Sequence, residues 1–427
     1  MVGSRRNAQL LAALLASVLV GCSLPFQGDE GEPAATEGAA APAATTAAAA
    51  PTVGLPTELP GPTAEPFGPA IAHFEPEQLV LITFIHMVSP SVGWGIGGLE
   101  GAQDHVLRTQ DGGTTWQDLT PPEPDSEPGE VAKAAVGIFL DAEVVRVIYY
   151  PASLTPEPYV ATVWATEDGG TSWTASQPIS LDFLGSTDFP PLLRFMDADN
   201  GWLLAQQGAA GMHRYPVYLL RTTDGGRTWD TAVDSYEGGG LQSCNKTGLF
   251  FLDAQTGWVT VDNCPVTAPE LSVTADGGLT WEARPLPAPT NRPTLFEDAQ
   301  CEAHSPQLLT PAIGFVGVSC RLGLAIEYVY VTQDGGLTWE PHLNQGGSLV
   351  MLSPRVGFAL SRHIYRTLDG GATWNATRVG AVTWDGQFSW IDELNGWAVA
   401  RDNQALALVK TDDAGRNWDL LKPRIGP

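Results

Sequence analysis

Positive charge is scarce in this sequence. Its 427 residues include 22 Lys and Arg against 48 Asp and Glu, which gives a formal net charge of −26. A field of this sign opposes contact with phosphate, so the balance argues against nucleic-acid binding and against electrostatic adsorption to an anionic membrane. Hydrophobic residues are not scarce: at 43% of the chain they can form a sizeable core and exclude disorder of the whole chain.

Glycine, proline and tryptophan are plentiful. The chain contains 47 Gly, 34 Pro and 14 Trp. Because Gly and Pro are the residues that cost most inside helices, this composition favours many short strands joined by tight turns. We therefore expect an all-β fold.

The amino-terminal residues have the pattern of a targeting segment. A basic pair at 5–6 precedes an apolar stretch at 8–20, which is short for a membrane span, and the lipobox LVGC ends at Cys22. We predict a lipoprotein signal peptide at 1–21 and a lipid on Cys22 that anchors the protein to the cell membrane on its extracytoplasmic side. An ordinary secretory signal is the alternative.

The next segment is low in complexity. From about residue 27 to 70 the chain is mostly Ala, Pro, Thr and Glu, with little to bury. We predict that 22–75 comprises the lipidated cysteine and a disordered tether, and that 76–427 is the folded domain.

The motif Thr-x-Asp-x-Gly-x-Thr-Trp, called the box below, occurs seven times. Each copy follows an alternating apolar run and precedes a second short strand, so each marks the turn of a β-hairpin. The Asp can accept hydrogen bonds across the turn, the Gly supplies a positive φ, and the Trp packs over the hairpin. Since the position recurs in every repeat, a structural role is favoured over a catalytic one. The box carboxylates are Asp111, Asp168, Asp224, Asp276, Asp334, Asp369 and Asp413.

A second motif, Gly followed by Trp or Phe, lies upstream of six of the boxes, and only the second unit lacks it. Each unit therefore offers two hairpins, or four strands, in about 50 residues, which is the size of one propeller blade. The sequence predicts a seven-bladed β-propeller of four-stranded blades. The aromatic residues of this motif are Trp94, Trp202, Trp258, Phe315, Phe358 and Trp397.

The boxes resemble the Asp-box, or BNR, repeat of sialidases and sortilin-type receptors. Together with the Gly-Trp turn, the pattern is most similar to the photosystem II assembly and stability factor family, and the resemblance covers about residues 80–421. It implies the propeller fold. The residues at that family's basic position before the Thr are Arg108, Arg221, Arg366 and Lys410.

The resemblance to sialidases supplies an alternative, a sialidase-like glycoside hydrolase or a carbohydrate-binding propeller. It implies an Arg triad, a Tyr with a supporting Glu, and an Asp acid. The apolar-Arg-Ile-Pro motif expected before the first box is missing, since Arg424-Ile425 is followed by Gly426 at the carboxyl terminus. The arginines outside the boxes that could supply a triad are Arg146, Arg194, Arg214, Arg292, Arg321, Arg355 and Arg401.

Four cysteines remain after Cys22, in two pairs at matching positions. In each pair one cysteine lies 14 residues before the aromatic residue of the second motif and the other lies five or six residues after it. Antiparallel neighbours can come within bridging distance there. A metal site at Cys301-x-x-His304 lacks companion ligands, so no metal or other cofactor is predicted. The predicted disulfides are Cys244–Cys264 and Cys301–Cys320.

The working surface can be assigned to one face. Box turns and Gly-Trp turns share a face, because both connect strands that run the same way, so the links between hairpins and between blades lie on the other. That second face carries the variable segments. We expect it to bind another protein, as a non-catalytic scaffold, with carbohydrate as the alternative ligand. The candidate contact residues are His213, Arg214, Tyr215 and Arg292.

Overall fold

The computed structural model describes the chain from residue 69 onward, with gaps. The described ranges are 69–126, 132–151, 160–181, 190–207, 215–235, 240–241, 244–262, 268–344, 347–360, 363–379, 383–402 and 405–427. The chain divides into the units Met1–Thr63 and Ala64–Pro427, and every described residue belongs to the second. The predicted signal peptide, Cys22 and most of the predicted tether therefore lie outside the described residues.

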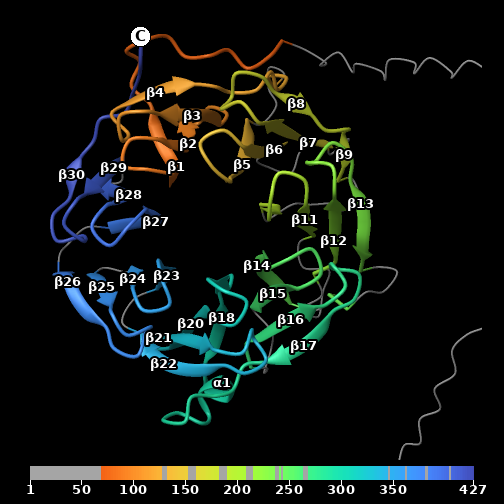
Figure 1. Cartoon of the computed structure of the whole chain (residues 1–427), viewed down its shortest axis with the longest axis vertical. Helices are drawn as coiled ribbons and strands as arrows, with labels where there is room; N and C mark the ends of the chain where they lie inside the picture. Colours follow the sequence, from red (N-terminus) through yellow and green to blue (C-terminus); the bar gives the residue numbers. More distant parts are fainter. Residues whose placement is uncertain are drawn as a thin grey trace, which may run out of the picture. The chain divides into compact units, whose positions relative to one another are not determined.

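Seven β-sheets follow one another around a ring (Figure 1). Blade 1 is formed by β1 (Leu81–Met87), β2 (Gly93–Gly98), β3 (His105–Thr109) and β4 (Thr115–Asp118). Blade 2 is formed by β5 (Lys133–Phe139), β6 (Val145–Pro151), β7 (Val160–Thr166) and β8 (Thr174–Ala175), and β9 (Ile179–Ser180) also pairs with β7. Blade 3 is formed by β10 (Leu192–Phe195), β11 (Gly201–Gln206), β12 (Val217–Thr222) and β13 (Asp230–Asp234).

The remaining blades repeat this order from the inner to the outer edge. They are formed by β14 (Asn245–Phe251), β15 (Gly257–Asp262), β16 (Glu270–Thr274) and β17 (Glu282–Pro285); β18 (Gln300–Ala303) and β19 (Gln307–Leu308), β20 (Gly314–Leu322), β21 (Leu324–Thr332) and β22 (Glu340–Asn344); β23 (Ser348–Met351), β24 (Gly357–Leu360), β25 (His363–Thr367) and β26 (Asn375–Val379); and β27 (Thr383–Trp390), β28 (Gly396–Asp402), β29 (Ala405–Thr411) and β30 (Asp419–Leu420). The all-β class and the seven four-stranded blades are thus confirmed.

One short helix accompanies the strands in the described part of the chain. It is α1 (Leu295–Asp298), which lies in the link between blades 4 and 5. No helix among the described residues has the length and apolar character needed to cross a membrane.

The two hairpin turns of each blade touch one another. The first Gly of the box, or Ala414 in blade 7, donates its N–H to a carbonyl in the turn between the first and second strands at 2.8–3.0 Å. Ala414 adopts a φ of 64°, so the left-handed conformation is kept even where Gly is absent. We call the face that carries these turns the turn face, and the opposite one, with the links between hairpins and between blades, the loop face.

Aromatic residues on the second strands seal the seams between blades. Trp94, Trp202 and Trp397 are fully buried, and each indole N–H donates to a carbonyl of the next blade, on Asp141, Gly277 and Gly112 respectively, at 2.8–3.2 Å. The arginine or lysine that pairs with the aromatic residue on the third strand lies over the ring, as in Arg108 over Trp94 at 5.4 Å. In blades 1, 3, 6 and 7 the aromatic residue therefore lies under a cation. In blades 4 and 5 a valine, Val273 or Val331, stands at the paired position instead.

Blade 2 departs from this pattern. Arg146 stands at the aromatic position of its second strand, opposite Ala165 on the third. Its side chain is fully buried and donates to the carbonyl oxygen of Ala198 in blade 3 at 2.6 Å and to Thr166 O at 3.1 Å. Burial lowers the pKa of this guanidinium, which Glu167 at 3.2 Å partly offsets. Arg146 therefore stands in place of both the aromatic ring and the cation that lies over it in other blades.

The ring closes through the last strand of the chain. β31 (Arg424–Ile425) runs parallel to β4 and becomes the outermost strand of blade 1. The indole of Trp397 reaches blade 1 from blade 7, and the N–H of Met87 in blade 1 donates to Ser389 Oγ in blade 7 at 2.7 Å. The carboxyl end of the chain thus joins the first and last blades (Figure 1).

Candidate binding surface

The box carboxylates are held entirely within their own turns. Each accepts a backbone N–H from the residue four positions later at 2.9–3.0 Å, and a hydrogen bond from that residue's side chain at 2.5–2.7 Å. The hydroxyl of the Thr two positions earlier also donates to it. Hydrogen bonds from Ser172 and Thr338 are the main cause that lowers the pKa of Asp168 and Asp334 to about 2. Such groups are ionised at neutral pH and cannot serve there as general acids.

The sequence-predicted contact residues are only partly described. His213 and Arg214 lie outside the described residues. Arg292 is exposed on the link before α1, whereas Tyr215 is 7% exposed. Tyr215 lies in the link between β11 and β12 of blade 3, whereas Arg292 lies in the link between blades 4 and 5.

Tyr215 helps to hold a buried lysine under the loop face. Its carbonyl oxygen accepts from Lys246 Nζ at 2.9 Å, and the carbonyl of Cys244 accepts from the same Nζ at 2.8 Å. Burial lowers the pKa of Lys246 to about 7, while Glu270 acts in the opposite direction. Tyr215 therefore has a packing role through its backbone.

A buried polar cluster lies under the loop face of blades 1 and 2. His105 Nδ1 is 2.8 Å from Asp118 Oδ2, and Phe74 stacks on the His105 ring at 3.9 Å. Burial alone would raise the pKa of Asp118, but hydrogen bonds, chiefly from His105, keep it lowered. Glu123 accepts from the Trp164 indole at 2.6 Å. Asp118 thus holds the backbone of Phe74 against blade 1, and Glu123 holds the link after β4 against Trp164 of blade 2. His105 is 3% exposed, so a substrate has no access to it.

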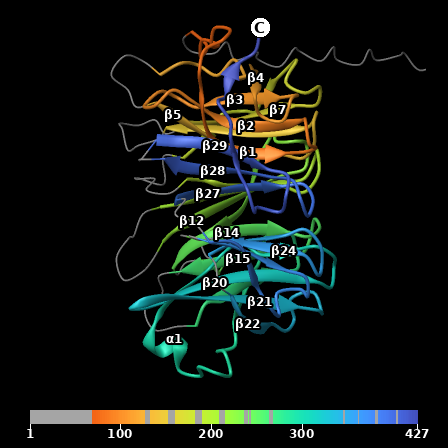
Figure 2. The ribbon, with the colours of Figure 1, turned by 90° about the vertical axis from the view of Figure 1, so that its left-hand side faces the viewer.

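Blade 5 projects beyond its neighbours on the loop face. β20 and β21 have nine residues each and pair up to Leu322 and Leu324, around Gly323 with a φ of 75°. The tip leucines are 46% and 82% exposed, respectively. The side view in Figure 2 shows this hairpin reaching out past the strands of the other blades. We call residues 319–327 the projecting hairpin.

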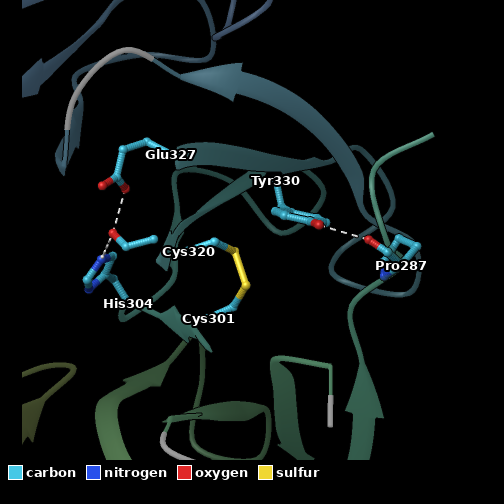
Figure 3. Close-up of a disulfide and its surroundings, with 7 residues drawn as sticks. Pro287, Cys301, His304, Cys320, Glu327 and Tyr330 are labelled. Carbon is cyan, nitrogen blue, oxygen red and sulfur yellow. Dashed lines mark hydrogen bonds between the residues drawn. A yellow bond between two sulfur atoms is a disulfide. The ribbon is translucent and has the colours of Figure 1, made fainter. Parts of the chain in front are cut away.

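A disulfide and a polar relay brace the base of the projecting hairpin. Cys301 and Cys320 are joined, as predicted, and tie β18 to β20 (Figure 3). Ser319 Oγ donates to Glu327 at 2.5 Å and lies 2.9 Å from His304 Nε2. Burial raises the pKa of Glu327, opposed by the bond from Ser319. Cys244 is also disulfide-bonded, but its predicted partner Cys264 lies outside the described residues.

The described arginines outside the boxes are dispersed. Arg194 is the one arginine among the described residues of the innermost strands, where it lies over Phe250 at 4.8 Å. Arg146 is sealed in a seam, Arg321 is on the projecting hairpin, and Arg355 is on the turn face. These four arginines therefore have different surroundings, and Arg194 is the one of them on an innermost strand.

The projecting hairpin was not among the sequence-predicted contact residues. A signal for it exists: strand-forming residues continue without a proline on both sides of Gly323 between 314 and 332, and β20 and β21, at nine residues each, are the longest strands described. The length of this stretch predicts strands that outrun the blade. The exposed tip leucines follow from that length.

Comparisons with known proteins define the class. No protein-family model and no curated protein sequence matches the chain. Among solved structures it is similar to YCF48 bound to D1 peptide (15% identity, 81% of this chain and 99% of that chain, TM-score 0.48). It is also similar to the GH74 xyloglucanase from Xanthomonas campestris (14%, 80% and 53%, 0.49) and to a prolyl endopeptidase (10%, 81% and 50%, 0.51). The chain spans about half the length of the two enzymes. These likenesses show a β-propeller and nothing finer.

Proposed function

We propose that this chain is a lipid-anchored, extracytoplasmic propeller that binds another protein through its loop face and carries out no chemistry of its own. The lipobox ending at Cys22 supports the anchor. The projecting hairpin of blade 5 supports the binding role, and it is the observation on which the proposal depends.

Exposed leucines on a braced hairpin have the properties of a binding anchor. Leu322 and Leu324 are open to solvent, and burying such a side chain contributes roughly 1.5–3 kcal/mol. The Cys301–Cys320 disulfide and the Ser319–Glu327 bond hold the hairpin in place, which reduces the entropy lost on binding. Arg321, which precedes the tip residue Leu322 and is exposed, supplies a charged group beside the two leucines.

The enzyme alternative receives less support. A sialidase-type site requires three arginines and an acid to converge. Among the described arginines outside the boxes, Arg194 is the one on an innermost strand, Arg146 is sealed in a seam and Arg355 is on the turn face. The box carboxylates are ionised and occupied by turn hydrogen bonds. No feature of the described residues favours carbohydrate over protein.

The test is a chemical cross-linking and pull-down from detergent-solubilised membranes of the source cells. The variant L322E/L324E changes only exposed positions, and L337E/L368E is the matched control, with exposed leucines on the turn face. We expect the tip variant to lose the partner that the wild type and the control both capture. Loss in the control instead, or turnover of a fluorogenic sialoside by the purified protein, would contradict the proposal.

A further inference from the structure

Blade 7 has an incomplete outer edge. β30 pairs with only Val409 and Lys410 of the seven-residue β29, and Leu421 N–H then donates to Leu408 O at 2.8 Å. Beyond Leu421 the chain leaves for blade 1, where Pro423 O accepts the N–H of Val80 at 3.1 Å. Closing the ring therefore removes the end of the outer strand from blade 7.

The first residues of β29 are left with an open edge. Because backbone groups alternate in direction along a strand, the outward carbonyl of Leu408 means that the N–H and C=O of Leu406 also point outward. Within the described residues, no strand pairs with the outer side of 405–407. In blade 6, by contrast, β26 pairs with β25 from His363 to Arg366.

An apolar groove runs beside this open edge. It has a volume of about 300 Å³, and its walls come from residues 79–82, 405–408 and 420–423. Leu79 and Leu420 at its rim are 65% and 60% exposed. An open strand edge next to apolar walls is the combination by which a sheet accepts an added strand, with backbone bonds for affinity and side-chain pockets for selection.

The groove carries a charge opposite to that of the protein as a whole. Lys422 is the one charged residue among those that line it, although acids outnumber bases 48 to 22 in the chain. A lysine beside an apolar groove pairs with a carboxylate of the occupant.

We propose that the groove between blades 7 and 1 binds an extended apolar peptide segment of a partner protein, added as a strand to β29, with a carboxylate of the peptide on Lys422. The carboxylate can be a chain terminus or an acidic side chain. The chain's own tether is a poor occupant, because proline lacks the N–H that a ladder needs and residues 51–66 contain five prolines. A second copy is disfavoured by the net charge of −26 on each chain.

The experiment measures fluorescence anisotropy of a labelled peptide of alternating Val and Thr with a free carboxyl terminus, added to the folded protein. Two further forms are N-methylated, one on every Val and the other on every Thr. Since only one set of N–H groups can face Leu406, we expect saturable binding of the parent, loss for one methylated form and retention for the other. No saturable binding, or equal behaviour of both methylated forms, would overturn the strand-addition proposal.

Protein variants locate the site. L406P removes an outward N–H, and L79E places a charge on the groove rim; each should weaken binding about tenfold or more. L79E alters an exposed side chain, so it remains informative should L406P prevent folding. The control L337E changes a leucine on the turn face that is 70% exposed. Equal weakening by L79E and L337E would refute the location.

A separate set of peptides tests the role of the peptide carboxylate. A carboxamide form of the peptide should bind less tightly, and a carboxamide form with one Glu should regain affinity if an acidic side chain suffices. K422Q should remove the difference between the carboxylate and carboxamide forms; a difference that persists would overturn the role of Lys422. The variant L322E/L324E should bind the peptide normally, so failure of the blade 5 proposal is distinguishable from failure of this one.

Discussion

Arg146 offers the sharpest test of how neighbouring blades hold together. Arg146→Ala would remove a fully buried guanidinium that donates to Ala198 O in blade 3 at 2.6 Å and to Thr166 O at 3.1 Å within blade 2. Arg221→Ala is the matched control. Arg221 lies over Trp202 at 5.8 Å, and that tryptophan seals the next seam by its own indole bond to Gly277.

The two substitutions should differ in magnitude. For Arg146, the loss of buried stem surface and the exposed, unpaired carbonyl of Ala198 together cost about 2–3 kcal/mol. Water from the adjoining pocket of about 230 Å³ can reach this carbonyl, which keeps the loss at that level. For Arg221 the cation–π contact contributes about 0.5–1 kcal/mol. Arg146→Met keeps the stem and should fall between them.

Urea unfolding followed by tryptophan fluorescence measures the difference. We expect the midpoint of Arg146→Ala to fall well below that of Arg221→Ala at an unchanged slope. If the two variants unfold at the same midpoint, Arg146 does not join blades 2 and 3 in the way that its contacts indicate.

Three other predictions concern the anchor, the second disulfide and acid stability. Palmitate labelling and membrane association should be lost in Cys22→Ser; equal labelling of the variant would exclude the lipobox. Tryptic mapping without reduction should join Cys244 to Cys264, and a free thiol at either position would contradict the pairing. The lowered pKa of the box carboxylates means that their contribution to stability is present above about pH 4 and is lost as the pH falls through about 2. The prediction applies to Asp168 and Asp334. Unfolding midpoints that do not decline across this pH interval would argue against a stabilising role for these two carboxylates.

The repeat made the blades predictable. A box that recurs seven times reports a hairpin turn each time, and the turn is local: Asp111 finds its partners between Thr109 and Thr115. The Cys301–Cys320 bond was predictable for the same reason, because the two cysteines face each other across paired strands of one blade. Local pattern suffices where the contacts are local.

Contacts between blades were not predictable in the same way. The role of Arg146 depends on which carbonyl of blade 3 lies above it, and the sequence marks only the missing Gly-Trp. The two-residue β31 has no periodicity to detect, yet it closes the ring. The groove next to β29 exists only because that closure takes the chain away from blade 7.

The two proposed binding features both lie where a blade departs from sevenfold regularity. A blade that follows the pattern has its second-strand aromatic sealed against the next blade, its box carboxylate bonded within the turn and its third strand covered, which leaves little to offer a partner. Blade 5 breaks the pattern by extending a braced hairpin, and blade 7 breaks it by exposing the edge of β29. Both departures lie on the loop face, where strand lengths can change without disturbing the turn contacts that every blade shares. Because the two proposed sites lie on one face, binding of a single partner that engages both would be weakened by the variant at the hairpin tip and by the variants at the groove alike.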